Sequence, residues 1–342
     1  MRARKGTALV LCACLCLIQG CSHVDDRVQP APQFPRPLWS ELEEKVLALD
    51  PEVLSENDVS EVLARGPSPR IVALDGSIPI VTMESFAKFL VLMGYPEGSV
   101  RNPQNGSYTY SSHRDSQEMA GMIAWYYEKE GMRPVVIGHS QGGMLSVKIL
   151  YELAGTFHEK VAVWNPRSGK AEDRYSIVDP LDGRDRPVIG LKLGFASAIA
   201  TGKGMRILLS QWDMLNRLRK IPDTVEEFTG FHVKYDLISG TLFGIGQGDR
   251  YSPVGSSKVR NVVLPSGSTH LGVPVMEHLA KNSAARQWIQ SYSPARGLEG
   301  ASDLQGEGRN ILLAAELWHS IKKHWCLELK RSILSKRREG QG

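Results

Sequence analysis

One stretch of ten residues constrains the fold of this chain more than any other. Residues 134–143 read Pro-Val-Val-Ile-Gly-His-Ser-Gln-Gly-Gly: a short apolar run, a glycine-rich turn, and then a segment of helical character over 144–153. A strand, a sharp turn and a helix in that order are the unit from which parallel α/β sheets are built. The stretch therefore predicts one strand of such a sheet, with Ser140 at the tip of its turn.

The turn itself is Gly138-His139-Ser140-Gln141-Gly142, a G-x-S-x-G pattern. A serine at the tip of such a turn has strained backbone geometry, and side chains two residues before and after it would collide, so both positions take glycine. The turn lifts the hydroxyl out of the carboxyl edge of the sheet, and the helix that follows points its N-terminal amides at the same place. The backbone N–H of Gln141 can then help to stabilise an oxyanion, and the pattern predicts a nucleophile elbow.

These five residues resemble the elbow of α/β-hydrolase lipases and esterases, and the resemblance covers about residues 68–292. It implies a mostly parallel sheet flanked by helices and a Ser–acid–His triad in that chain order. It also implies that the loop after an earlier strand, here residues 70–74, supplies a second oxyanion amide. Gly76 would let the backbone approach a substrate, with the N–H of Ser77 or Ile78 as the donor. Asp75 stands where the family commonly has histidine, so the donor stays open between these two.

The catalytic base must lie in a loop at the carboxyl edge, where the elbow presents Ser140. His270 follows the expected last strand, residues 259–264, among glycines and small residues that leave an imidazole room to turn toward the serine. The acid has two candidates. Asp249 follows the penultimate strand by a loop and is favoured, whereas Asp236 falls inside that expected strand, residues 231–238. The predicted triad is therefore Ser140, His270 and Asp249.

The N-terminus resembles a bacterial lipoprotein signal. Three basic residues precede the apolar run 8–18, which is too short to span a bilayer, and the run ends in Ile18-Gln19-Gly20-Cys21. The resemblance implies cleavage after residue 20, lipidation of Cys21 with chains such as palmitate, and an outer-membrane location facing the periplasm. The proline-rich residues 21–37 are then a tether, and residues 38–292 the hydrolase domain.

Residues 165–230 interrupt the pattern of strands. A charged, loop-like part is followed by apolar residues at helical spacing over 191–220, and strands resume only near Phe231. An insertion at this place matches the cap of the resembled lipases. The resemblance therefore implies a helical cap over about 165–230 that covers the site.

The last part, 293–342, is predicted to be a flexible linker followed by an amphipathic helix over 311–338. From Arg309 onward this part has eight basic and three acidic residues. A basic amphipathic helix with tryptophans can lie on an anionic membrane, and it can equally fold back onto the domain. Both alternatives stay open.

Composition narrows the classes of function. Removing the signal leaves 38 of the 41 basic residues beside 37 acidic ones, a balance that gives no support for a nucleic-acid partner. The chain has no metal-ligand cluster, P-loop or dinucleotide motif, so no cofactor is expected. We expect a lipid-anchored serine esterase or lipase that acts on acyl esters. The alternatives are an acyltransferase that uses the same triad and a non-catalytic scaffold lipoprotein of the envelope.

Overall fold

The computed structural model describes residues 36–77, 81–202, 212–241, 245–297, 299 and 310–339. Within these residues the centre of the fold is a five-stranded sheet in the order β1-β2-β7-β9-β11. The strands are β1 (Ile71–Leu74), β2 (Val135–His139), β7 (Leu193–Ile199), β9 (Val225–His232) and β11 (Lys258–Val263). Every neighbouring pair is parallel, so all five strands end at the same edge of the sheet. The protein is thus an α/β protein with a parallel central sheet flanked by helices.

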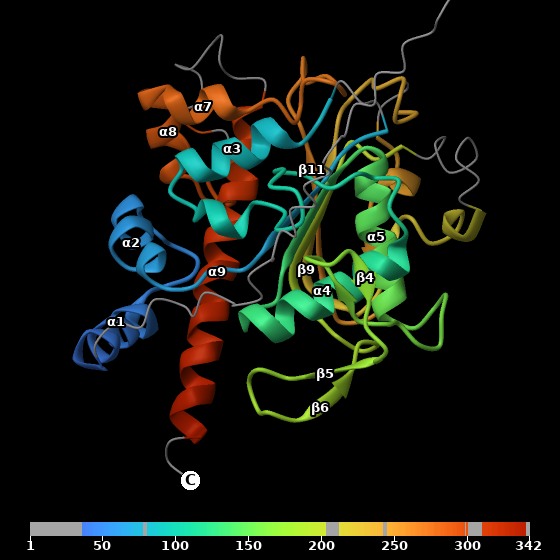
Figure 1. Cartoon of the computed structure of the whole chain (residues 1–342). Helices are drawn as coiled ribbons and strands as arrows, with labels where there is room; N and C mark the ends of the chain where they lie inside the picture. The colour runs from blue at the N-terminus through green and yellow to red at the C-terminus, as the bar shows by residue number, and fades with distance from the viewer. Residues whose placement is uncertain are drawn as a thin grey trace, which may run out of the picture. The chain divides into compact units, whose positions relative to one another are not determined.

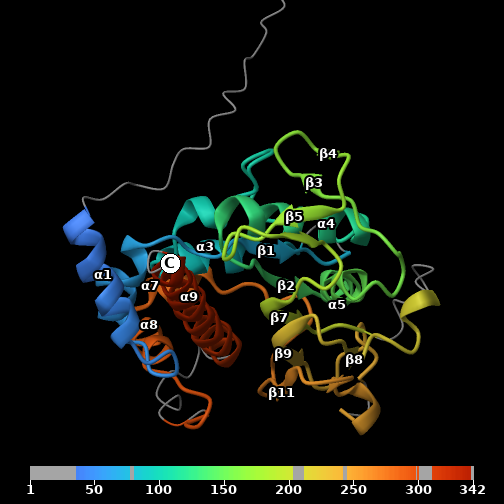
Figure 2. The same cartoon turned by 90° about the horizontal axis from the view of Figure 1, so that it is seen from below.

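Two helices cover one face of this sheet and make the crossovers between its first strands. They are α4 (Ser116–Glu130), between β1 and β2, and α5 (Gln141–Leu153), between β2 and β7. Their buried side chains, such as Ile123 and Leu150, form one core with Val72, Val136 and Ala196 of the strands. Figures 1 and 2 show α4 and α5 on the side of the sheet opposite α9.

A second core fills the other face. It joins Ile71, Val135 and Phe195 of the strands to the long C-terminal helix α9 and to helices on either side of it. These helices are α1 (Arg36–Ala48), α2 (Glu56–Glu61), α3 (Glu84–Leu92), α7 (Glu277–Lys281), α8 (Ser283–Gln290) and α9 (Ile311–Glu339). Parallel strands need cover on both faces, and on this face α9 supplies much of it.

Short elements complete the described residues. They are the 3-10 turns η1 (Leu63–Arg65), η2 (Glu97–Ser99), η3 (Trp212–Met214) and η4 (Gln247–Asp249), and the strands β3 (Trp164–Asn165), β4 (Lys170–Ala171), β5 (Ser176–Val178), β6 (Asp185–Pro187), β8 (Lys220–Ile221) and β10 (Ser252–Pro253). Strands β3 and β4 pair with each other, as do β5 and β6, and these two hairpins fill much of the region expected to begin a cap.

The predicted helical cap over 165–230 is therefore wrong in its main part. Residues 193–199 are the middle strand β7, parallel to β2 and β9, and β9 also begins inside the expected cap. The run Leu-Gly-Phe-Ala-Ser-Ala-Ile is apolar on both faces because both are buried, and periodicity cannot tell such a strand from a buried helix. Strand β3, at the start of the expected cap, lies outside the central sheet. Residues 203–211 of the expected cap lie outside the described residues.

The C-terminal helix folds back onto the domain, the second of the two alternatives. Trp318 and Trp325 are fully buried, and Trp325 donates a hydrogen bond to the carbonyl of Pro67 (2.9 Å). The domain predicted to end at residue 292 therefore includes α9, and one compact unit spans residues 35–342. None of the described helices combines the length and the apolar character needed to cross a bilayer.

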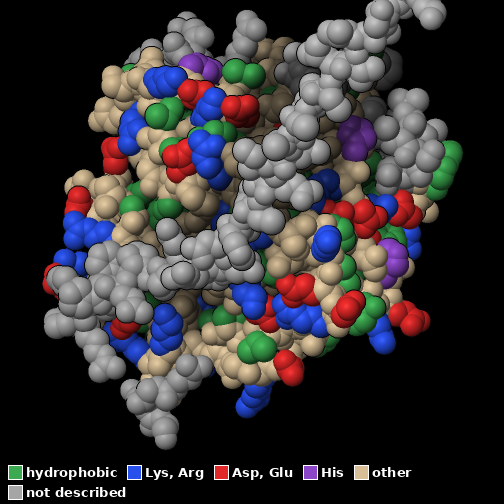
Figure 3. Space-filling view, viewed as in Figure 1, with side chains coloured by type: hydrophobic (Ala, Val, Ile, Leu, Met, Phe, Trp, Pro, Cys, Tyr) green, Lys and Arg blue, Asp and Glu red, His purple; other side chains and the backbone are tan. Residues whose placement is uncertain are grey.

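Two further expectations lie outside the described residues: the signal and lipidation site at 1–21, and the tether, except its last two residues, which are in α1. On the face drawn in Figure 3, basic and acidic side chains are interspersed.

Candidate functional site

Four loops meet at the carboxyl edge of the sheet. Because the strands are parallel, the residues that follow β1, β2, β9 and β11 all lie at this edge. They carry Asp75–Ser77 after β1, Ser140 after β2, Asp236 after β9 and His270 after β11. In open α/β sheets, this edge is where ligands and reactive side chains are held. The topology thus brings together residues that are far apart in the sequence.

Three of these side chains form one hydrogen-bonded chain. Ser140 Oγ lies 2.9 Å from Nε2 of His270, and Nδ1 of the same imidazole lies 2.7 Å from Oδ2 of Asp236. All three residues are buried. The predicted pairing of Ser140 with His270 is present in the structure. An imidazole placed between a serine hydroxyl and a carboxylate can take the hydroxyl proton while the carboxylate orients the ring.

The prediction that Asp249 contacts this imidazole is wrong. Asp249 lies in η4, where its Oδ2 accepts a hydrogen bond from the N–H of Gly246 (2.9 Å). The error arose because β9 is shorter than the strand that the sequence predicted. Residues 231–238 were expected to be one strand, but β9 ends at His232, so Asp236 lies in the loop beyond it. The alternation of residue types along the sequence continues past His232, where β9 ends. This pattern therefore placed the Asp236 carboxylate inside a strand.

The loop after β9 holds the Asp236 carboxylate in its ionised form. Oδ1 accepts hydrogen bonds from the N–H groups of Ile238 (2.9 Å) and Ser239 (3.2 Å), while Oδ2 faces the imidazole. Burial by itself would raise the pKa of Asp236. The hydrogen bonds from His270 and Ser239, with the charge of the imidazole, outweigh it and lower the pKa below its ordinary value.

Ser140 has the strained backbone expected of an elbow. Its φ is 54° and its ψ is −114°, a conformation that residues other than glycine rarely adopt. The neighbouring glycines are required by close approach of the backbone. A Cβ on Gly138 would lie 2.0 Å from the carbonyl oxygen of Gly142, and one on Gly142 would lie 2.4 Å from that of Leu74. Gln141 begins α5, where the first N–H groups have no partner within the helix.

The turn after β1 lies against this elbow. A Cβ on Gly76 would lie 3.5 Å from Cβ of Ser140, so the backbone of the turn borders the nucleophile. Asp75 braces the turn: Oδ1 accepts from the N–H of Met83 (2.7 Å) and Oδ2 from Oγ1 of Thr109 (2.9 Å). Burial raises the pKa of Asp75 despite these bonds. Ser77 lies in this turn, whereas the alternative donor Ile78 is outside the described residues.

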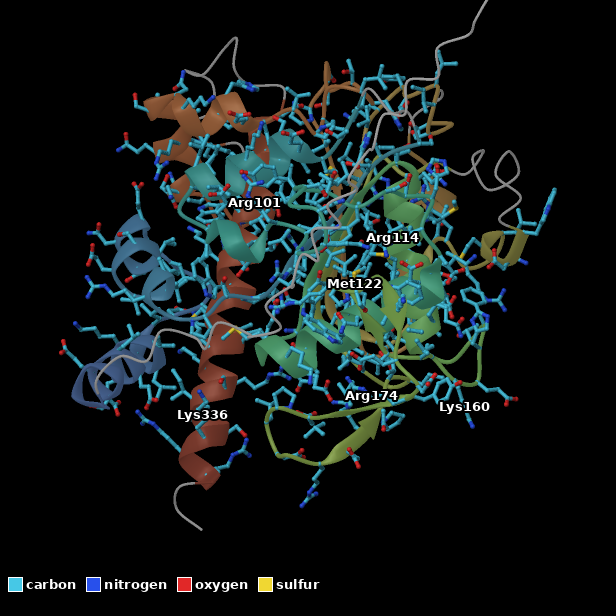
Figure 4. The ribbon with its side chains drawn as sticks, in the orientation of Figure 1. Arg101, Arg114, Met122, Lys160, Arg174 and Lys336 are labelled. Atoms are coloured by element: carbon cyan, nitrogen blue, oxygen red, sulfur yellow. The ribbon has the colours of Figure 1, made fainter. Side chains whose placement is uncertain are left out.

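A cavity of about 310 Å³ lies next to Gln141, between α5 and the loop before α4. Its lining mixes polar side chains, such as Ser112, His113, Arg114 and Lys148, with the apolar Met144 and Leu145. Figure 4 shows Arg114 beside α5. Gln141 Nε2 donates to the carbonyl of Ser112 (3.4 Å), and Ser112 Oγ donates to that of Gly76 (3.1 Å). The wall of the cavity is thus connected to the turn that borders Ser140.

One contact of the site could not be predicted from the sequence, although His139 itself belongs to the elbow pattern. His139 contacts the backbone of His270 across the carboxyl edge, with Nε2 2.9 Å from the His270 carbonyl oxygen. Local pattern cannot predict a contact between residues that are 131 positions apart.

Among the described residues, no group of three or more His, Cys, Asp or Glu side chains is arranged to hold a metal ion. No family model matches the chain, and no curated protein matches it either.

Proposed function

We propose that this protein is a serine hydrolase of the α/β-hydrolase type that cleaves carboxylic esters through an acyl-enzyme on Ser140. The observation that carries the proposal is the continuous hydrogen-bonded chain from Ser140 Oγ through the His270 imidazole to Asp236. It stands on a strained turn at the edge of a parallel sheet, and this turn fixes the direction of the nucleophile.

The roles follow from the geometry. Ser140 Oγ attacks the ester carbonyl carbon while His270 Nε2 takes its proton, and Asp236 stabilises the imidazolium that forms. The negative charge on the carbonyl oxygen is met by the N–H of Gln141 and by one from the turn at Ser77. His270 then gives its proton to the departing alcohol as the C–O bond breaks. Water, deprotonated by the same imidazole, attacks the acyl-enzyme and releases the acid and Ser140.

Apolar side chains near the triad favour substrates with an apolar acyl group. Tyr235 and Leu237, on either side of Asp236, are 69% and 74% exposed, and Leu271, the residue after His270, is 45% exposed. Ile238 and Val275 are also exposed, and we call these five residues, each within five positions of Asp236 or His270 in the sequence, the apolar rim. Large apolar side chains grouped around a site often mark contact with an apolar ligand or surface. We therefore place lipid-like acyl esters first among the substrates.

The location proposed for the protein rests on the N-terminal sequence alone. Lipidation of Cys21 would anchor it in the outer membrane of a bacterial envelope, with the domain in the periplasm. This places the hydrolase close to lipid substrates.

Labelling by a fluorophosphonate probe tests the function. The wild-type domain is compared with the Ser140→Ala and His270→Ala variants, each checked for folding by circular dichroism. We expect strong labelling of the wild type, loss in Ser140→Ala, and a decrease of about 10³-fold or more in the labelling rate of His270→Ala. A folded wild-type protein that stays unlabelled, with and without detergent micelles, would refute the proposal and favour the scaffold alternative.

A further inference from the structure

His139 is a buried, titratable side chain that the mechanism above does not use. It is 1% exposed and immediately precedes Ser140. Its Nε2 lies 2.9 Å from the backbone carbonyl oxygen of His270, and the centres of the two imidazole rings are 5.0 Å apart. A carbonyl oxygen only accepts hydrogen bonds, so Nε2 of His139 must carry the proton. The residue before the nucleophile is therefore bonded to the backbone of the residue that activates it.

The other ring nitrogen faces the turn after β1. Nδ1 of His139 is buried and has no hydrogen-bond partner within the described residues, and a Cβ on Gly76 would lie 3.1 Å from it. Burial first, and then the charge of His270, lower the pKa of His139 to about 4. The ring is neutral at physiological pH, with its proton on Nε2. It fills the space between the elbow, the His270 loop and the turn at Gly76.

The loop that carries His270 closes through local backbone hydrogen bonds, from Ser268 N–H to Pro265 and from Gly272 and Val273 N–H to Thr269. Beyond His270, Asn310 Nδ2 donates to the carbonyl of Gly272 (2.6 Å). The bond from His139 is a long-range tie to the carbonyl of His270 itself. It holds the backbone of the base while Asp236 holds the ring. Because both the backbone and the ring of His270 are held, the imidazole is restricted to the orientation that faces Ser140.

We propose that His139 is a positioning residue that sets the distance from His270 to Ser140 and holds the turn at Gly76 against the elbow. The inference builds on the proposed function, since it assigns a role within the same site. It predicts that kcat depends on the Nε2–H donor of His139 rather than on the size of the ring. Glutamine can place an amide N–H where Nε2 lies, whereas leucine fills much of the same volume without a donor.

The test compares His139→Gln with His139→Leu. For hydrolysis of a water-soluble ester, we expect kcat of the leucine variant to fall roughly 10- to 100-fold with little change in KM, because the reacting groups are misplaced while the substrate still binds. The glutamine variant should keep kcat within a few-fold of the wild type. Thermal unfolding of both variants accompanies the kinetics. Wild-type kcat in a folded leucine variant, or equal losses in both variants, would overturn the proposal.

A second measurement does not depend on catalysis. The low-field proton NMR signal of His270 Nδ1–H, which is hydrogen-bonded to Asp236, reports the orientation of that ring. We expect this signal to persist in the glutamine variant and to broaden or shift in the leucine variant. An unchanged signal in the leucine variant would overturn the positioning role. If the signal responds as expected but no ester is hydrolysed, the positioning role stands and the proposed function fails.

Discussion

Asp236 Oδ2 lies 2.7 Å from Nδ1 of His270, and this contact joins two loops that leave neighbouring strands. β9 and β11 are parallel and paired from Glu227 to His232, so their carboxyl ends lie side by side. Asp236 follows the end of one strand by four positions, and His270 follows the end of the other by seven. The pairing of the strands brings the acid to the base.

This contact predicts which aspartate matters for catalysis. Asp236→Asn removes the charge that stabilises the imidazolium and allows the wrong tautomer, so we expect kcat to fall about 10³- to 10⁴-fold. Asp249→Asn is the matched control, with kcat expected within about 3-fold of the wild type, since Oδ2 of Asp249 accepts a hydrogen bond from Gly246 within its own turn. Steady-state ester hydrolysis measures both. The reverse order of losses would return the acid to Asp249.

The buried tryptophans of α9 predict that this helix is essential to the fold. Trp325 is fully buried, packs 4.7 Å from the ring of Tyr95 and donates to Pro67. Trp325→Ala should lower the free energy of unfolding by about 3–5 kcal/mol in urea titration. Leu334→Ala, a half-exposed position on the same helix, should change it by less than about 1 kcal/mol. Equal effects would contradict the buried role of α9.

An ion-pair cluster between β9 and α9 predicts part of the acid sensitivity. Glu227 accepts from Lys323 (2.8 Å) and lies 3.2 Å from Nε2 of His324. Burial would raise the pKa of Glu227, but the hydrogen bonds from His324 and Lys323 lower it to about 2. A carboxylate whose pKa is lowered by folding stabilises the protein above its unfolded pKa. That stability is lost as the pH falls from about 4.5 toward 2.

Glu227→Gln should therefore reduce the free energy of unfolding at neutral pH by roughly 1–3 kcal/mol and flatten its decline between pH 4.5 and 2. Glu61→Gln removes an exposed pair with Arg65 and should have little effect. Denaturant titration at several pH values measures both variants. A Glu227→Gln curve parallel to that of the wild type would show that this carboxylate is not linked to acid unfolding.

The apolar rim predicts a preference for longer acyl chains. Leu237→Ser and Leu271→Ser each remove apolar surface beside the triad, so the ratio of kcat/KM for a long-chain ester to that for an acetate ester should fall about 10-fold. Val53→Ser changes an equally exposed apolar side chain on the turn before α2 and serves as the control. An unchanged ratio in both rim variants would exclude the rim from acyl binding.

The proposed lipoprotein signal predicts a modification at one cysteine. Expression with labelled palmitate should label the wild-type protein, whereas Cys21→Ser should carry no label and leave the membrane fraction. Cys326→Ser is the control and should keep the label, because Cys326 is buried in α9. Label retained in Cys21→Ser would overturn the proposed anchor.

The sequence by itself determined the parts whose cause is local. The bounds of α4 depend on local signals, because Asp115 caps its first turn and Gly131 ends it in the left-handed conformation. The elbow is local in part: the close approach of Gly138 to Gly142 depends on residues four positions apart, whereas Gly142 is also required by its approach to Leu74. His270 was found because it follows a strand that the pattern placed well. Such features are specified by turn, cap and spacing alone.

Only the tertiary structure decided which aspartate contacts His270, whether residues 193–199 form a strand, and where α9 packs. Asp236 and Asp249 both follow β9, and the choice depends on where that strand ends beside β11. Residues 193–199 become a strand because β2 and β9 offer hydrogen bonds on both sides, which an apolar run does not reveal. The stripe on α9 fits a membrane or a protein core equally well. The uncovered face of a parallel sheet decides between them, because it buries the stripe against other apolar side chains.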